Sequence, residues 1–254
     1  MESMQRAFEM RLPIGFTDEA GHVHRSAWLR KMRGHEEALL LDPTITAGRL
    51  VTELIRSCLV RLGDLESIDI DVVAGLYTAD RNYLLLELRR ITFGDRLIEA
   101  YYCPRCGSEV SVVEDLSEIE VRRLGEDEAL SDIDVMLEDG YVDRQSTAHK
   151  EVRLGLPCGR DEEFVSPMME KDPLKAQDAL LLRCIRRFGT LPKSALEAYG
   201  VKILRDLTLG DRQRLQRAFA EQAPGVNFER SISCGQCSAA FEGVMDLSGF
   251  FVLS

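Results

Sequence analysis

The chain has 254 residues, of which 45% are apolar and 30% charged, a composition that supports a buried core and excludes global disorder. Its 43 acidic and 32 basic side chains give a formal net charge of −11, so the average field repels nucleic-acid phosphates and anionic lipid. No stretch approaches the ~18–20 uninterrupted apolar residues of a membrane-spanning helix, and the length suits two lobes.

The first part of the chain combines turn residues with helical patterns. The close spacing of Pro13, Gly15 and Gly21 predicts an irregular, extended N-terminal arm over residues 1–30. Apolar residues at three- and four-residue steps then predict an amphipathic helix over 46–62 and another over about 78–91. Together with the ribbon that follows, these helices make up a first predicted repeat, residues 31–117.

Two cysteine-containing ribbons follow the helical segments. The alternating pattern on either side of Cys103-Pro-Arg-Cys106 predicts a β-hairpin with a cysteine knuckle at its turn. Residues 118–147 are rich in Asp and Glu and form a predicted acidic connector between the lobes. Residues 148–254 are predicted to form a second helix-plus-ribbon repeat, with helices near 180–188 and 209–223.

A duplicated motif indicates that the two lobes are copies of one unit. Cys103-x2-Cys106-x8-Asp-Leu-Ser and Cys234-x2-Cys237-x8-Asp-Leu-Ser have the same internal spacing. The hexapeptides Ile91–Arg96 and Leu207–Arg212 also resemble each other, and we interpret them as equivalent corners with a helix over 212–222 inserted in the second copy. The predicted fold class is α+β, with two pseudo-repeated lobes of helices and short β-ribbons joined by a four-cysteine, zinc-ribbon-like site.

The repeated cysteines have the spacing of metal ligands. A Cys-x-x-Cys turn presents two thiolates, and two such turns complete the tetrahedral set that zinc prefers. We therefore predict a structural zinc bound by Cys103, Cys106, Cys234 and Cys237. Redox catalysis is an alternative, but a redox Cys-x-x-Cys normally opens a helix after a strand. Unmetallated thiols are the remaining option.

The sequence contains no recognisable catalytic constellation. It has four histidines, none with zincin spacing, and His22 and His24 lie in a stretch whose composition indicates a solvated turn. A glycine-rich phosphate loop, a nucleophile elbow and a dinucleotide fingerprint are all missing from the sequence. We therefore predict no catalytic residues, no small-molecule substrate and a protein that is not an enzyme.

Several short motifs, taken in order, resemble one known family. They are Leu12–Asp18, Met32–Glu37, Arg81–Arg90 running into Thr92–Asp95, the first knuckle, and Arg153–Asp161. In this order they resemble the T-even-type baseplate proteins of contractile phage tails and phage-like injection systems, labelled baseplate hub proteins or tail assembly chaperones. The resemblance covers about residues 8–250. It departs at Cys158, where a small polar residue such as threonine is expected.

The resemblance implies a non-enzymatic structural or assembly protein whose partners are other baseplate, tube, spike or sheath proteins. It implies a location in the bacterial cytoplasm during assembly and in the baseplate if the chain is retained; the sequence leaves open a chaperone that dissociates. Apolar residues of the N-terminal arm are the predicted partner contacts, with burial in their own core as the alternative: Leu12, Phe16, Trp28 and Leu29. A zinc-ribbon module that binds nucleic acid is the rival function, although the knuckles offer only Arg105 as a basic side chain.

Overall fold

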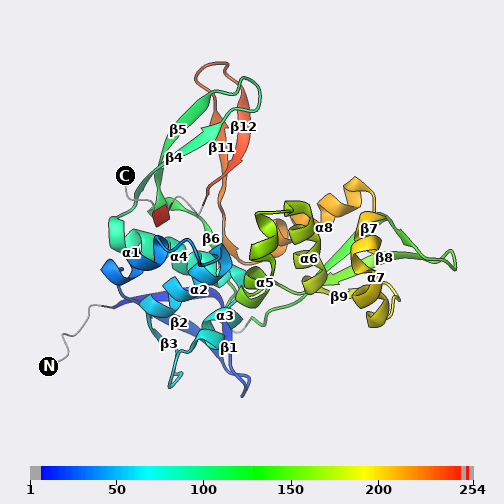
Figure 1. Ribbon diagram of the computed structural model, residues 1–254, viewed down its shortest axis with the longest axis horizontal. Helices are drawn as coiled ribbons and strands as arrows, with labels where there is room; N and C mark the ends of the chain where they lie inside the picture. Colours follow the sequence, from blue (N-terminus) through cyan, green and yellow to red (C-terminus); the bar gives the residue numbers. More distant parts are fainter. Residues whose placement is uncertain (1–6, 127, 247–249, 252–254) are drawn as a thin grey trace.

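The structure is a computed structural model that describes residues 7–126, 128–246 and 250–251. Two lobes lie side by side, and a pair of β-ribbons projects from them (Figure 1). Lobe 1 and its ribbon have the element order ββααβαα and then ββ: β1 (Phe8–Thr17), β2 (Val23–Leu29), α1 (Gly34–Leu40), α2 (Ala47–Cys58), β3 (Leu59–Leu62), α3 (Ile70–Gly75), α4 (Thr78–Phe93), β4 (Arg96–Tyr102) and β5 (Glu109–Asp115).

Lobe 2 repeats this order of elements. It contains β7 (Ile133–Val142), β8 (Ala148–Leu154), α5 (Gly159–Met169), α6 (Pro173–Cys184), β9 (Ile185–Phe188), α7 (Lys193–Arg205) and α8 (Leu209–Gln222), and its ribbon is β11 (Glu229–Ser233) with β12 (Ala240–Val244). Between the copies lie the 3-10 turn η1 (Leu116–Glu118) and the short strand β6 (Val121–Arg122), which pairs with β10 (Gly225–Val226). The predicted α+β fold with two pseudo-repeated lobes is confirmed.

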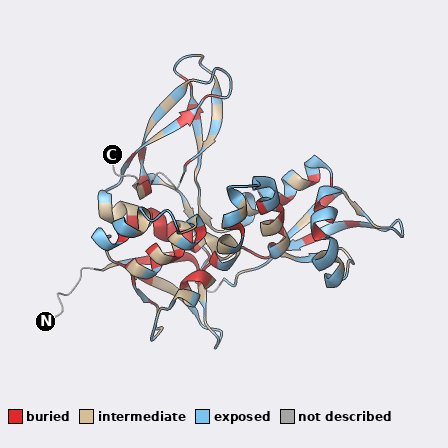
Figure 2. Ribbon diagram, in the orientation of Figure 1, coloured by how far each residue is buried: buried red, intermediate tan, exposed pale blue. Residues whose placement is uncertain are grey.

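Each lobe is built around a three-stranded antiparallel sheet. The strand orders are β1-β2-β3 and β7-β8-β9. Both hairpins contain an irregularity at the same place, between Arg11 and Phe16 in β1 and between Met136 and Tyr141 in β7. Apolar side chains of the sheet and helices form one core in each lobe, with a smaller cluster at the base of the ribbons (Figure 2).

Equivalent aspartates hold the irregular part of each hairpin. The Asp80 carboxylate, in the first turn of α4, accepts hydrogen bonds from the backbone N–H groups of Ile14 (2.8 Å) and Gly15 (2.9 Å). Asp211, in the first turn of α8, accepts three such bonds from the β7 bulge at 2.7 to 3.0 Å. Because Asp80 and Asp211 are separated by the same sequence interval as Cys103 and Cys234, α8 is the counterpart of α4.

The predicted inserted helix is therefore wrong. The hexapeptide Ile91–Arg96 runs from the end of α4 into β4, whereas Leu207–Arg212 runs into the beginning of α8. Glycine and aspartate occur at both places for different reasons, a C-cap with φ +92° at Gly94 and an N-terminal turn in α8. The extra residues of the second copy lie in α7, which has 13 residues against 6 in α3.

Residues 1–6 of the arm predicted over 1–30 lie outside the described residues, and the rest is part of lobe 1 instead of an irregular, extended arm. Strands β1 and β2 pair on both sides of the bulge, and Leu12 and Leu29 are completely buried in the core of lobe 1. The glycines that suggested an irregular arm occupy the bulge (Gly15, φ +101°) and the hairpin turn (Gly21, φ +86°), where a positive φ is required.

The acidic connector is shorter than predicted, because lobe 2 begins with β7. Carboxylates such as Asp134 and Glu138 alternate with the buried side chains of Ile133 and Leu137, so the charges lie on the solvent face of a strand. The acidic composition of this segment predicts a connector, but the alternation of its acidic and apolar residues is the pattern of a strand with one buried face. In the part of the chain that the structure describes, no helix combines the length and apolarity needed to cross a bilayer.

Candidate metal centre

The turns of the two ribbons have the same backbone hydrogen bonds. The N–H group of Cys103 donates to the Ser108 carbonyl, and the N–H group of Gly107 donates to the Cys103 carbonyl, both at 2.9 Å. The same two bonds recur at the equivalent positions around Cys234. A positive φ closes each turn, at Gly107 (+72°) and at Ser238 (+55°). Each turn therefore presents its two thiols in the same way.

The four thiols meet between the ribbons. All four sulfur atoms lie within 4.8 Å of one another. Cys103 Sγ lies 3.6 Å from Cys237 Sγ, and Cys106 Sγ lies 3.7 Å from Cys234 Sγ. Zinc with tetrahedral bonds of ~2.3 Å separates its sulfur ligands by about 3.8 Å, so these distances fit a four-thiolate site. They are too long for disulfide bonds, whose S–S distance is about 2.05 Å.

The environment of the cluster fits a closed structural site. Cys103 and Cys234 are buried, Cys237 is half-buried and Cys106 is exposed. The Ser108 hydroxyl, 3.1 Å from Cys106 Sγ, and the Ser108 backbone N–H lower the pKa of Cys106 to about 6. Within the described residues, the cluster contains four cysteines and neither histidine nor carboxylate. Four thiolates would fill a tetrahedral zinc and leave no position for a substrate.

Side-chain contacts also hold the ribbons face to face below the cysteines. The Tyr101 ring of β4 packs where a Cβ at Gly243 would approach it to 2.7 Å, so only glycine fits at that point of β12. The Glu114 carboxylate accepts hydrogen bonds from Tyr101 Oη (3.0 Å) and from Arg230 Nε (3.2 Å) of the other ribbon. The thiols are therefore brought together by packed strands.

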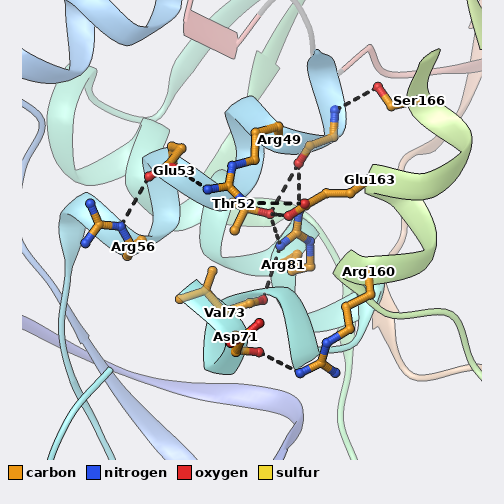
Figure 3. Close-up of polar contacts among 11 residues, drawn as sticks. Arg49, Thr52, Glu53, Arg56, Asp71, Val73, Arg81, Arg160, Glu163 and Ser166 are labelled. Carbon is orange, nitrogen blue, oxygen red and sulfur yellow. Dashed lines mark hydrogen bonds and ion pairs between the residues drawn. The ribbon is translucent and has the colours of Figure 1, made fainter. Parts of the chain in front are cut away.

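The lobes meet at a second place, where α5 of lobe 2 packs against α2 and α3 of lobe 1 (Figure 3). The completely buried Arg81 of α4 donates to Thr52 Oγ1 (3.0 Å) and to the carbonyls of Val73 and Gly48 (both 3.2 Å). Its Nε donates to Glu162 Oε2 of α5 at 2.7 Å. One guanidinium therefore connects lobe 1 to lobe 2.

Further polar contacts surround Arg81 at this junction. Ser166 Oγ accepts a hydrogen bond from the Gly48 N–H (3.0 Å), and Arg160 donates to the Asp71 carbonyl (2.9 Å) (Figure 3). A Cβ at Gly48 would lie 2.9 Å from the Glu162 carbonyl oxygen, so glycine permits the close approach of α5. The counterpart of Gly48 on α6 is the exposed Leu174, so lobe 2 does not repeat this docking surface.

The structure places the predicted partner-binding residues inside lobe 1 or at its edge. Leu12 and Leu29 are completely buried in the core of lobe 1. These two residues therefore follow the alternative, burial in their own core, and their side chains are not accessible to a partner. Phe16 is partly buried against the same core, and Trp28 is partly buried under the guanidinium of Arg61, 4.6 Å from the ring centroid.

Sequence reasoning missed Arg81 as a junction residue. The signal that could have found it is the Asp-Arg pair at residues 80–81, which recurs at 211–212. Arg212 donates to the buried carboxylate of Asp178 at 2.7 Å, as Arg81 donates to Thr52 at the equivalent position. The repeated pair marks the same contact within each lobe, and only Arg81 also reaches the other lobe, through Glu162.

The fold and the site together define a duplicated, two-lobed α+β protein in which four thiols converge from the two copies. The chain matches the family described as "T4 bacteriophage base plate protein" over residues 29–252, most of its length. It therefore belongs to this family of phage baseplate proteins, which confirms the resemblance noted in its sequence. Comparison with curated proteins and comparison with solved structures each gave no match.

Proposed function

We propose that the chain is a non-enzymatic structural or assembly protein of a contractile-tail baseplate, and that a structural zinc clasps its two halves. Family membership over residues 29–252 supports a place in the tail. The observation that carries the zinc proposal is the convergence of Cys103 with Cys237 and of Cys106 with Cys234 at tetrahedral spacing. The proposed partners are other baseplate, tube, spike or sheath proteins, met during assembly in the bacterial cytoplasm.

The proposed zinc would have one chemical task, which is to link thiolates of the two ribbons. Each copy supplies half of the ligands, so neither ribbon alone completes the site. Metal binding of this kind contributes roughly 10–16 kcal/mol in small zinc domains, comparable with the ~5–15 kcal/mol stability of a whole domain. A scaffold clasped in this way would keep its lobes in one arrangement while other proteins assemble on it.

The assembly role is tested by deleting the gene and imaging the particles by electron microscopy. We expect particles without sheathed tails, and we expect the wild-type gene supplied from a plasmid to restore them. Quantifying the chain in purified, contraction-competent particles then distinguishes a resident subunit from a chaperone that leaves. Normal tails that contract normally in the deletion strain would contradict the proposal.

Nucleic-acid binding is less well supported by the charges of the structure. Several arginines of α6 and α8 are paired with carboxylates, such as Arg183 with Asp161 (2.6 Å) and Arg214 with Glu138 (2.6 Å). A zinc-ribbon reader of nucleic acid needs an unneutralised basic face. Titration of the purified protein with DNA at low and high salt tests this rival directly, since phosphate binding weakens steeply with salt.

A further inference from the structure

The outer faces of the two ribbons differ, although the ribbons are copies. On β4 and β5 the face that points away from the other ribbon carries Ile98, Tyr102 and Val113, which are 71%, 67% and 56% exposed. Ile98 and Val113 are cross-strand partners, so they form one continuous surface, and Tyr102 lies on the same face of β4. We call these three side chains the outer strip.

The second ribbon serves as an internal control for this strip. The counterparts of Ile98 and Tyr102 on β11 are Glu229 and Ser233, and only Val244 remains apolar, as the counterpart of Val113. The same ribbon geometry is therefore compatible with a polar outer face. Folding does not require the exposed isoleucine and tyrosine of the first ribbon, so their presence needs another explanation.

We propose that the outer strip is a docking surface for another protein of the assembly, one that presents an apolar patch bordered by lysine or arginine. This inference rests on the proposed baseplate role. The strip projects from the body on its ribbon (Figure 1), and tyrosine and exposed aliphatic side chains are typical centres of such contacts. Carboxylates flank it at both ends, Glu109 near the knuckle and Asp115 near the base.

The charges around the outer strip indicate which kind of protein can bind there. Arg96 lies opposite Asp115 on the same face and balances its charge, so Glu109 at the other end leaves the border with one net negative charge. A second copy of this chain would bring the same border and its own net charge of −11, so charge disfavours self-association. A different protein with basic residues around an apolar patch complements both the strip and its border.

The test replaces outer-face residues of the first ribbon by the residues at the equivalent positions of the second ribbon. The double variant Ile98→Glu with Tyr102→Ser introduces the residues found at the equivalent positions, so the fold should tolerate them. Zinc content and melting temperature of the purified variant report on folding, and Val244→Ser is the matched control. In the deletion strain we expect the double variant to lower functional tails at least tenfold and Val244→Ser to restore them fully.

A photo-crosslinking amino acid identifies the occupant in the same strain. Placed at position 98, it should form an adduct with a different tail protein, and placed at position 229 it should not. Wild-type levels of tails with the double variant, or an adduct of the chain with itself, would overturn the docking proposal. Normal tails after gene deletion would instead overturn the baseplate role, so the two failures are distinguishable.

Discussion

At the scale of single residues, the residue at a position of one copy can be replaced by the residue at the equivalent position of the other copy, and the structure predicts how the free energy of unfolding changes. Ser238 has φ +55°, a left-handed conformation that the other ribbon gives to Gly107 (φ +72°). Such a conformation costs a non-glycine residue roughly 1 kcal/mol. Ser238→Gly should therefore raise the free energy of unfolding by about 0.5–1 kcal/mol in a urea titration of the metal-loaded protein, and Gly107→Ser should lower it. A loss of stability in Ser238→Gly would show that the serine side chain has a role of its own.

A second residue-scale prediction concerns Glu36. It is completely buried, and burial alone would raise its pKa, but hydrogen bonds from Arg30, Ser57 and the Arg33 N–H lower the pKa to about 2, from an ordinary value of 4.5. The unfolded chain therefore takes up the proton first as the pH falls. The stability that the charged form contributes is complete above about pH 5 and is lost between 4.5 and 2.

The comparison of wild type with Glu36→Gln isolates the contribution of Glu36, because all other titrating groups, including the four cysteines, are the same in both proteins and cancel in the difference. We expect the difference in their free energies of unfolding to be largest near neutral pH and to shrink as the pH falls through this range. Urea titrations at a series of pH values measure it. A difference that stays constant with pH would show that the Glu36 charge contributes no stability.

At the scale of elements, the α5 junction should depend on the partner of Arg81. Glu162→Ala leaves a completely buried guanidinium without its carboxylate, and breaking such a pair costs about 3–5 kcal/mol. The exposed pair of Arg153 with Asp134 is the control, because solvent screens such a pair and Asp134→Ala should change the free energy of unfolding very little. Chemical denaturation of both variants checks the contrast. If both variants lost the same small amount of unfolding free energy, the hydrogen bonds of Arg81 to the carbonyls and to Thr52 would be enough to stabilise its buried charge.

Individual elements also show what the sequence could and could not predict. The helix predicted over 46–62 was right as far as Cys58, because the apolar residues of α2 follow one helical face, and wrong over Leu59–Leu62, which form β3. The helix predicted over 78–91 is α4, which is buried on more than one face. The cysteine ribbons were predictable because two spacings agree. The β1–β2 hairpin was missed, since its glycines serve a bulge and a turn that only the paired strands reveal. Arg81 was missed because its partners come from distant segments.

At the scale of the whole molecule, the chain is a duplication whose copies have diverged at their contact surfaces. The cysteine ribbons meet symmetrically, each first cysteine against the second cysteine of the other pair. The lobe contact is one-sided, because Gly48 of α2 admits α5 and its counterpart Leu174 does not offer the same surface. The symmetric cysteine ribbons would hold the metal, whereas the surfaces that differ between the copies can contact different neighbouring segments or proteins.

This arrangement predicts that both lobes respond to the loss of one ligand. Cys106→Ser and Cys237→Ser each remove one thiolate of the same proposed site, so each should abolish stoichiometric zinc binding and lower the melting temperature. Cys158→Ser, at a half-buried cysteine outside the cluster, should keep the metal. Metal retained at wild-type level in both cluster variants would contradict a four-thiolate site.

The metal content of the purified, unchelated protein tests the central claim most directly. Elemental analysis should give about one zinc per chain, the number that four thiolates from two ribbons can hold. Removal of that zinc with a chelator should lower the melting temperature, and zinc added back should restore it. Two zinc ions per chain, or none, would contradict the account of a duplicated scaffold clasped by a single metal.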